Sequence, residues 1–349
     1  MESHTFATDV PHRTLRSHRQ TGITHFVVSP SGLCHAFRHQ APQMHESAWH
    51  ERSDMTDVFT LGEAVGIITA ERIRHDMDVR LDIGGPELTT AVGLARLGHS
   101  VTWLGRVGAD ELGARIVTVL RGEGIDTTHI QTDPGASTGL AMRQRRIGRA
   151  GHVVHYRGGS AGSRLGPGDI PARAVQSAKI LHVTGITPAL SGTAWSAAHH
   201  AVKLARDSGL AVSVDVNYRP QLWIDRQEAV EALNELATGA DVLFANQEEL
   251  QLIEPTIGTI RELVVTRGSK GASSTVNGMR YDAQAAPVTA VDPAGAGGAF
   301  VAGYLSGVLE ELHPTDRLRR GCALAAFTIA SQSNWQGLPT RTELPPLTF

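Results

Sequence analysis

The chain has 349 residues, of which 41% are hydrophobic and 19% charged, and its formal net charge at pH 7 is −3. This length suits one large α/β domain or two ordinary ones, and the charge gives no electrostatic support for binding to nucleic acid or to an anionic membrane. The two cysteines, Cys34 and Cys322, indicate no disulfide framework. No apolar run reaches transmembrane length, and no apolar signal core opens the chain. We therefore expect a cytoplasmic protein.

Residues 1–54 differ in composition from the rest of the chain. They hold eight of the 17 histidines and sustain no helical or strand period. The histidine spacings match no tight set of metal ligands, so a disordered extension is favoured over a metal site. A gene start placed too far upstream is the other interpretation. We therefore expect the folded domain to span residues 55–349.

From Met55 onward, apolar strand patterns alternate with helical patterns. The predicted strands are residues 58–64, 100–108, 178–186, 210–217, 241–246, 262–268 and 287–291, and the predicted helices are 87–98, 111–124, 196–209 and 299–312. Such alternation predicts an α/β fold whose mostly parallel sheet is covered on both faces. Two stretches carry alternating and more polar patterns, which predict antiparallel strands inserted as a small β-sheet lid; they are residues 65–83 and 128–157.

A glycine-rich loop joins the last predicted strand to the last predicted helix. Residues 292–300 read DPAGAGGAF. Glycines allow a sharp turn that leaves backbone N–H groups bare, and a helix N-terminus adds free donors and a partial positive charge. The loop predicts a cradle for an anion such as phosphate, although a tight turn without a ligand is an equal alternative from this loop alone. No acidic residue lies between Asp292 and Glu310, so no base is adjacent to the cradle.

Further polar and glycine residues follow other predicted strands. Ligands of parallel sheets bind beyond the carboxyl ends of the strands, so these residues are expected to share one edge. They are Gly84 and Gly85; Asp215, Asn217, Tyr218 and Arg219; Asn246, Glu248 and Glu249; and Thr266, Arg267, Gly268 and Gly271.

Several of these segments resemble the motifs of one family. Residues 84–98 (GGPELTTAVGLARLG) and 292–305 (DPAGAGGAFVAGYL) resemble the two signatures of the ribokinase/PfkB family of carbohydrate kinases. Residues 246–249 resemble its N-x-x-E motif, which is linked to magnesium and phosphate, and residues 264–272 resemble its nucleotide-binding turn. The resemblance covers about residues 55–349. Within the family the chain is most similar to 2-keto-3-deoxygluconate kinases, through residues 155–165, 184–191, 215–223 and 334–344.

The resemblance implies a ribokinase-like three-layer fold with a β lid, and a kinase that transfers the γ-phosphate of ATP, with Mg²⁺, to a primary hydroxyl of a keto-deoxy sugar acid. The implied substrate residues are Gly84, Gly85, Thr89, His155, Tyr156, Arg157, Asn217 and Arg219. The two arginines would bind the substrate carboxylate. A lone arginine is more often solvated surface charge, and the paired motif context reverses this preference. The implied partner is this small molecule, with no nucleic acid and no membrane, and a homo-oligomer formed through the lid is one candidate assembly.

The resemblance also implies the residues at the nucleotide. Those that would contact it are Asn246, Thr266, Gly268, Gly271 and Asp292. Glu249 would reach Mg²⁺ through metal-bound water. Gly295, Ala296 and Gly297 would form the anion hole around the transferred phosphoryl group.

The chain departs from the family pattern at four places. Gly298 stands where the family has its catalytic aspartate, Thr89 where it has a substrate-binding asparagine, and Pro293 where it has a threonine. Residues 254–261 are too few for the usual intervening helix. Loss of a general base lowers a rate by about 10²–10⁴, so a catalytically silent sugar-acid or nucleotide sensor is an alternative function. A nucleoside or ribose kinase is less favoured, because a neutral sugar offers no carboxylate to the two arginines.

Overall fold

The computed structural model of the chain describes residues 55–71, 74, 78–144, 152–253 and 260–344, together with two short strands that precede them. The chain divides into two compact units, Met1–Ser53 and Asp54–Phe349. In the first unit, β1 (Phe26–Val28) and β2 (Cys34–Ala36) form an antiparallel pair, which the sequence did not predict. The rest of the predicted extension lies outside the described residues.

An eight-stranded sheet in the order β16-β15-β14-β13-β12-β11-β3-β6 forms the centre of the second unit. Its strands are β3 (Thr56–Leu61), β6 (Val101–Leu104), β11 (Ala178–Thr184), β12 (Ala211–Asp215), β13 (Val242–Asn246), β14 (Glu262–Thr266), β15 (Ala272–Val276) and β16 (Met279–Ala283). The pairs β14–β15 and β15–β16 are antiparallel, and the other neighbouring strands of this sheet are parallel. Thr184 pairs with Asp215 and Asn246 with Thr266, so these strand ends are level at one edge of the sheet.

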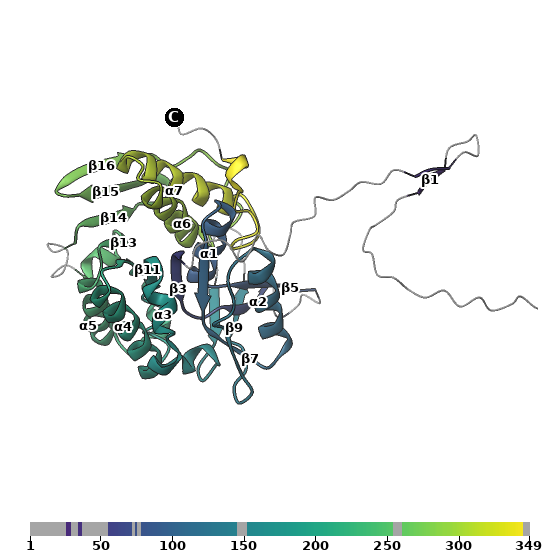
Figure 1. Cartoon of the computed structure of the whole chain (residues 1–349), viewed down its shortest axis with the longest axis horizontal. Coiled ribbons are helices and arrows are strands. Elements are labelled where there is room, and N and C mark those ends of the chain that lie inside the picture. The colour runs from purple at the N-terminus through teal and green to yellow at the C-terminus, as the bar shows by residue number, and fades with distance from the viewer. Residues whose placement is uncertain are drawn as a thin grey trace, which may run out of the picture. The chain divides into compact units, whose positions relative to one another are not determined.

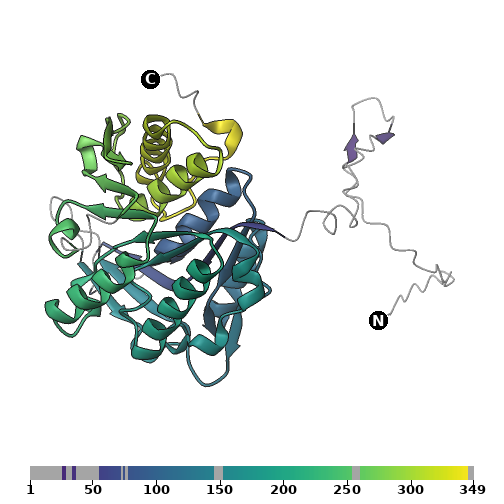
Figure 2. The ribbon, with the colours of Figure 1, turned by 60° about the vertical axis from the view of Figure 1, so that its left-hand side comes forward.

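Helices cover both faces of this sheet (Figures 1 and 2). One face carries α1 (Pro86–Arg96), α2 (Glu111–Gly122), α6 (Ala296–Leu309) and α7 (Pro314–Ile329), and the other carries α3 (Ala172–Gln176), α4 (Gly192–Asp207) and α5 (Arg226–Thr238). Each face has its own apolar cluster. Since successive strand residues point to opposite faces, Leu243 of β13 belongs to the α4–α5 cluster and Phe244 to the α1–α6 cluster. The predicted α/β fold is confirmed.

Two helices of this fold are in unusually close contact. A Cβ atom on Gly93 of α1 would lie 2.6 Å from the Cβ of Ala302 on α6. The absence of a side chain at position 93 therefore lets the two helices approach, and their N-termini are brought together at the edge where the strands end.

A smaller four-stranded sheet forms the lid. It has the order β10-β9-β4-β5, with β4 (Val65–Ala70), β5 (Arg80–Gly84), β9 (Leu140–Gln144) and β10 (His152–Tyr156). The prediction of a small second sheet is confirmed, although β4 and β9 are parallel. A fifth strand from the same stretches, β8 (Gln131–Asp133), pairs instead with β7 (Arg106–Gly108).

Three expectations about individual elements need correction. Residues 287–291 form no strand: their side chains are exposed, and the N–H of Val291 donates to the carbonyl of Ile329 (2.7 Å). The predicted strand 100–108 is split into β6 and β7 at Gly105, where a Cβ would lie 2.5 Å from the carbonyl oxygen of Gly62. Helices α5 and α7 were not anticipated. The segment that was predicted to be too short for the family's usual helix includes residues 254–259, which lie outside the described residues.

Among the described helices, none has the length and apolarity to cross a bilayer.

Candidate functional site

The glycine pair of the first signature joins lid strand β5 to helix α1. Gly84 is the last residue of β5, and Gly85 caps α1 with φ 155°. A Cβ on Gly85 would lie 2.7 Å from the carbonyl oxygen of Glu63, so this backbone conformation and this contact both require glycine. Thr89, one turn into α1, is buried and donates its hydroxyl to the carbonyl of Gly85 (3.0 Å).

The loop of the second signature has the shape predicted for an anion cradle. Gly295 caps α6 in the left-handed conformation with φ 83°, and a Cβ there would lie 1.9 Å from the carbonyl oxygen of Asn334. Ala296 begins the helix, and Gly297 is exposed with open space beside it. The buried Asp292 accepts a hydrogen bond from the N–H of Ala294 (3.0 Å). Free N–H groups of the first turn therefore face an accessible side of the loop.

The two signatures meet at Gly298. The hydroxyl of Thr90 donates to the carbonyl of Gly298 (3.1 Å). A Cβ on Gly298 would lie 2.8 Å from the carbonyl oxygen of Pro86 and 3.0 Å from the Cβ of Thr89. The glycine pair and the anion cradle are thus brought together, as the resemblance implies. The same contacts leave no room for a larger side chain at position 298 unless α1 or α6 shifts.

Arg157 is engaged in a buried ion pair that the sequence did not predict. Its Nε and Nη2 atoms both lie 2.6 Å from Oε2 of Glu63, whose side chain is fully buried. The hydroxyl of Ser160 donates to the other carboxylate oxygen of Glu63. Because two nitrogens of the guanidinium are committed to Glu63, a substrate carboxylate is left with Nη1.

His155 of the lid lies close enough to both predicted carboxylate-binding arginines for their charges to act on its ring. Burial, and then the positive charges of Arg157 and Arg219, lower the pKa of His155 to about 4, so its ring is neutral at pH 7. Its Nδ1 atom is buried and has no partner among the described residues. Arg219 is exposed, and among the described residues it donates only to the carbonyl of Tyr218 (2.9 Å), so it is open to a ligand. Tyr156, the next residue of β10, is 57% exposed.

Asp215 and Asn217 lie at the end of β12. Asn217 adopts φ 40°, and its amide donates to Oδ2 of Asp215 (2.8 Å), while its own Oδ1 atom is buried without a partner among the described residues. Burial, and then the negative charge of Glu249, raise the pKa of Asp215 to about 7. A carboxyl group that is partly protonated near pH 7 and a buried amide oxygen therefore lie at this edge of the sheet.

Glu249 is fixed by backbone donors. The N–H of Tyr218 binds its Oε1 (2.9 Å) and the N–H of Asn246 binds its Oε2 (2.8 Å), while the side chain of Asn246 accepts from the N–H of Glu249 (2.9 Å). Burial raises the pKa of Glu249. A cavity of about 330 Å³ opens here, lined by Tyr218, Pro220, Arg226, Asn246, Glu248, Glu249, Gln251 and Leu252.

The predicted nucleotide residues Thr266, Gly268 and Gly271 form the turn between β14 and β15. Thr266 ends β14, and Gly268 and Gly271 have φ 55° and 83°. A Cβ on Gly271 would lie 2.1 Å from the carbonyl oxygen of Ala283, so the turn depends on glycine there. These residues lie at the same edge as Asn246, the register partner of Thr266.

Four residues near this edge were missed by the sequence reasoning: Glu63, Glu87, Arg143 and Asn334. Glu87 is fully buried in the first turn of α1, accepts hydrogen bonds from the hydroxyls of Thr184 (2.6 Å) and Thr187 (3.0 Å), and has its pKa raised by burial. In the sequence, an acidic residue at the start of a predicted helix is indistinguishable from an ordinary exposed residue. Glycines pack against three of these side chains, Gly62 against Glu87, Gly162 against Glu63 and Gly84 against Asn334.

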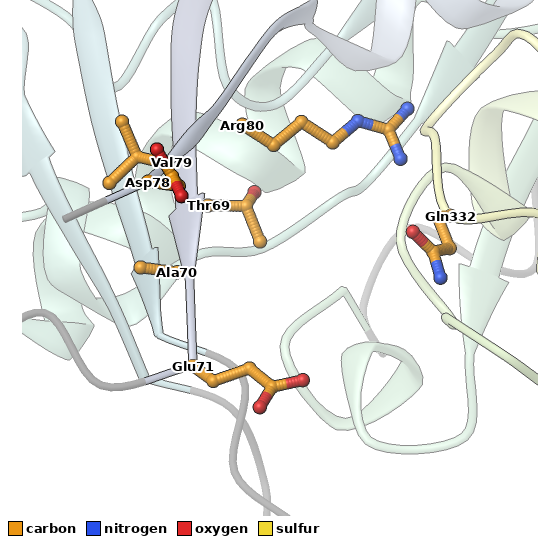
Figure 3. Close-up of a pocket in the computed structure, with 7 residues that line it drawn as sticks. All are labelled: Thr69, Ala70, Glu71, Asp78, Val79, Arg80 and Gln332. Carbon is orange, nitrogen blue, oxygen red and sulfur yellow. The ribbon is translucent and has the colours of Figure 1, made fainter. Parts of the chain in front are cut away.

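A second, larger hollow of about 480 Å³ lies on the lid, lined by Thr69, Ala70, Glu71, Asp78, Val79, Arg80 and Gln332. Figure 3 shows the side chain of Arg80 extending toward Gln332, with Glu71 on the other side of the hollow. None of the predicted site residues lines it. We therefore assign the candidate site to the edge of the main sheet and not to this hollow.

The raised pKa of Asp215 predicts a pH dependence of stability. An unfolded aspartate has a pKa of about 3.9, so the folded state holds this proton more tightly. The resulting stabilisation is complete below pH 4 and is lost as the pH rises toward 7. We expect Asp215→Asn to remove this loss, so that its free energy of unfolding falls less than that of the parent between pH 4 and 7 in urea titrations.

Asp282 provides a control of opposite sign. Arg280 and then Arg267 lower its pKa to about 2, so its contribution is present above its unfolded pKa and is lost only as the pH falls below about 4. Asp282→Asn should therefore leave the profile between pH 4 and 7 as it is. Identical slopes in this window for the parent and Asp215→Asn would show that Asp215 is ionised in the folded protein.

The chain is similar to known carbohydrate kinases. Residues 55–341 match the family described as pfkB family carbohydrate kinase. A 2-dehydro-3-deoxygluconokinase of Thermoproteus tenax is 35% identical over 314 residues, which cover 84% of this chain and 94% of that protein. A PfkB protein of Polaromonas sp. JS666 has a similar crystal structure, with a TM-score of 0.75, 32% identity, and coverage of 82% of this chain and 98% of that one. A sugar kinase of Pyrococcus horikoshii in complex with ATP has a TM-score of 0.75, 25% identity, and coverage of 82% and 96%.

Proposed function

The chain belongs to the pfkB family of carbohydrate kinases, and from that premise we propose that it uses ATP to phosphorylate a keto-deoxy sugar acid such as 2-keto-3-deoxygluconate. This compound is the 2-dehydro-3-deoxygluconate in the name of the Thermoproteus tenax relative. The family supports a phosphotransferase that acts on a carbohydrate hydroxyl. The choice of an acidic sugar rests on the site.

The observation that carries this choice is the exposed guanidinium of Arg219 near His155, which among the described residues donates only to the carbonyl of Tyr218. The charge of Arg157 is already compensated by Glu63, so Arg219 supplies the positive charge that a carboxylate would bind and a neutral sugar would not. A carboxylate matches guanidinium donors in shape and charge. The oxygen of Asn217, which has no partner among the described residues, and the carboxyl group of Asp215 add positions that can bind sugar hydroxyls.

The opposite side of the site suits the phosphate chain. The N-terminus of α6 offers free N–H groups and the positive end of its dipole to the transferred phosphoryl group. In the transfer, the sugar hydroxyl oxygen forms a bond to the γ-phosphorus while the bond from that phosphorus to the β–γ bridging oxygen breaks, and the hydroxyl proton leaves. Catalysis depends mainly on positioning these atoms and stabilising their charge.

The residues present fit a magnesium ion that is held mainly by the phosphates of the nucleotide and only indirectly by the protein. Among the described residues there is no group of three histidine, cysteine or acidic side chains able to hold a metal by themselves. Magnesium commonly keeps several waters and is held by one or two carboxylates and the substrate phosphates. Glu249 and Asn246 would orient such waters, and the ion would supply neutralisation of the charge on the β- and γ-phosphates.

The direct test of the proposal is ADP release by the purified protein with 2-keto-3-deoxygluconate and MgATP, with ribose and adenosine as neutral alternatives. Turnover with the sugar acid supports the proposal. Turnover only with a neutral substrate would contradict it. If ATP and the sugar acid both bind without turnover, the chain is a catalytically silent binding protein, the function that Gly298 raises as an alternative.

The role of Arg219 can be tested by binding alone. We expect Arg219→Ala to weaken binding of the sugar acid by roughly 2 kcal/mol, as for the loss of a charge-assisted hydrogen bond, while ATP affinity stays nearly unchanged. Calorimetric titration of both ligands measures this. Arg173→Ala, at an exposed position of α3, is the matched control. Equal weakening of both ligands by Arg219→Ala would mean that the residue is structural.

A further inference from the structure

Arg143 of the lid reaches the anion cradle. It lies on β9, an inner strand of the lid, where its register partners are Val153 on β10 and Thr69 on β4. Its Nη2 atom forms an ion pair with Oδ2 of Asp292, and its Nη1 atom lies 3.4 Å from Oδ1 of Asn334. The side chain is only 13% exposed. A residue of the small sheet is therefore anchored on the loop that begins α6.

Both residues that Arg143 contacts determine the shape of the cradle. Asp292 accepts from the N–H of Ala294, which fixes the backbone just before Gly295. The carbonyl oxygen of Asn334 occupies the position that a side chain on Gly295 would need, and the amide nitrogen of Asn334 lies 2.7 Å from the place of a Cβ on Gly84. Asn334 thus touches both the cradle and the glycine pair.

The loop around Asn334 is also tied to the edge strand of the lid. The hydroxyl of Ser333 donates to Oδ2 of Asp82 (2.8 Å), and the indole nitrogen of Trp335 donates to the carbonyl of Ile83 (3.2 Å). These bonds fix the loop to β5. Arg143 of β9 contacts Asp292 and Asn334. Two strands of the lid, β5 and β9, are therefore attached to the loops that form the cradle.

The charge of Arg143 matters as much as its position. Asp292 is 5% exposed, and its carboxylate lies at the start of the loop that would bind the phosphates. A buried carboxylate without a partner would repel an arriving triphosphate. The guanidinium of Arg143 neutralises this charge.

We propose that Arg143 is a positioning residue for phosphoryl transfer: from the lid, it neutralises Asp292 and holds the loop of Gly295 against Asn334, so that the cradle accepts a triphosphate only with the lid in place. This inference rests on the proposed function, because it takes ATP as the anion. It goes beyond that function by coupling the substrate-covering sheet to the phosphate site through one residue.

The central test is a double-mutant cycle read by calorimetric titration of MgATP and MgADP. Arg143→Ala should weaken MgATP binding by about tenfold or more, because Asp292 is then left unpaired. MgADP, which lacks the γ-phosphate, should change by less than about threefold. With Asp292→Asn as the background there is no carboxylate to neutralise, so adding Arg143→Ala should change MgATP affinity by less than about threefold.

The conservative variant and a lid control sharpen the cycle. Arg143→Lys keeps the charge and should retain MgATP affinity within about threefold, and it also serves if Arg143→Ala folds poorly. Val154→Ala shortens an apolar side chain of β10 that is 37% exposed, and it should leave MgATP affinity unchanged. If Arg143→Ala weakens MgATP binding equally in the parent and in the Asp292→Asn background, the guanidinium acts on the ligand or on the fold, and the proposal is wrong.

Amide hydrogen exchange without nucleotide separates this inference from the proposed function. Arg143→Ala should speed exchange in residues 294–298 as well as in β9, whereas Val154→Ala should leave residues 294–298 as protected as in the parent. Faster exchange in the lid alone would overturn the coupling even if the protein is a kinase. Conversely, absence of MgATP binding to the parent chain would overturn the proposed function, while joint deprotection would still support the coupling of lid and loop.

Discussion

Replacement of Glu63 by alanine should lower the free energy of unfolding by roughly 3–5 kcal/mol, as expected when one member of a buried ion pair is removed. The side chain of Glu63 is fully buried and that of Arg157 is 7% exposed, so the arginine would keep its charge without a partner or solvent. Removal of the carboxylate also leaves the hydroxyl of Ser160 without its acceptor. Urea unfolding at pH 7 measures the loss.

A surface pair and a double variant complete this experiment. Lys203 and Asp207 form an ion pair on α4 with side chains 73% and 61% exposed, and Asp207→Ala should cost less than about 1 kcal/mol. Glu63→Leu combined with Arg157→Leu should recover much of the loss, since a buried pair can often be replaced by apolar groups of similar size. A loss below about 1 kcal/mol for Glu63→Ala would show that water reaches this pair.

Replacement of Gly298 by aspartate should raise kcat by about 10²-fold or more if the family resemblance correctly places a general base at this position. The structure adds an expected penalty in stability. The new Cβ would lie 2.8 Å from the carbonyl oxygen of Pro86, and relief of such overpacking costs about 1–3 kcal/mol. The favourable interaction of a carboxylate with the N-terminus of α6, about 0.3–1 kcal/mol, does not offset this penalty.

Matched variants separate the base from the crowding. Gly298→Asn introduces the same volume without a base, so it should carry the stability loss and no gain in kcat. Gly297→Asp places a carboxylate in open space one residue earlier and should not raise kcat either. The complete reconstruction combines Gly298→Asp with Thr89→Asn and Pro293→Thr.

Two outcomes of this series decide the history of the site. Robust turnover by the parent chain would mean that another group accepts the hydroxyl proton, or that none is needed. Absence of turnover in the triple variant, with MgATP still bound, would favour a sugar-acid or nucleotide sensor over a recently silenced kinase. Steady-state ADP release and calorimetric titration provide both readings.

Much of the fold could be predicted from the sequence because its elements are separated by strong local signals. The alternation of apolar strands with helices ending at Gly98 and Gly209 specifies a parallel sheet, and motif glycines with positive φ, such as Gly271 and Gly295, mark turns that only glycine tolerates. The segment 287–291 was predicted wrongly because its apolar residues alternate like a strand. A strand also needs a neighbour, and sequence periodicity does not supply one.

The candidate site was harder to predict because its connections are long-range. Arg157 was interpreted as a ligand contact, and the structure adds a partner 94 positions away in Glu63. Arg143 and Asp292 are 149 positions apart. Neither pair has a local sequence pattern, because an ion pair between distant residues depends on how the lid and the main sheet are brought together. The roles predicted for the individual site residues remain predictions, to be tested by the substitutions above.

The close contact between α1 and α6 has a consequence for how this sequence can change over generations. Because Gly93 sits against Ala302 and Gly298 against Thr89, a substitution on one helix is constrained by the residues on the other. An aspartate at position 298 would be accommodated without a loss of stability only in descendants whose α1 had already moved away. The order of mutations therefore matters: a lineage that has lost the carboxylate and then tightened this contact cannot regain it in one step without a loss of stability. Such packing would make the loss of a carboxylate at position 298 difficult to reverse.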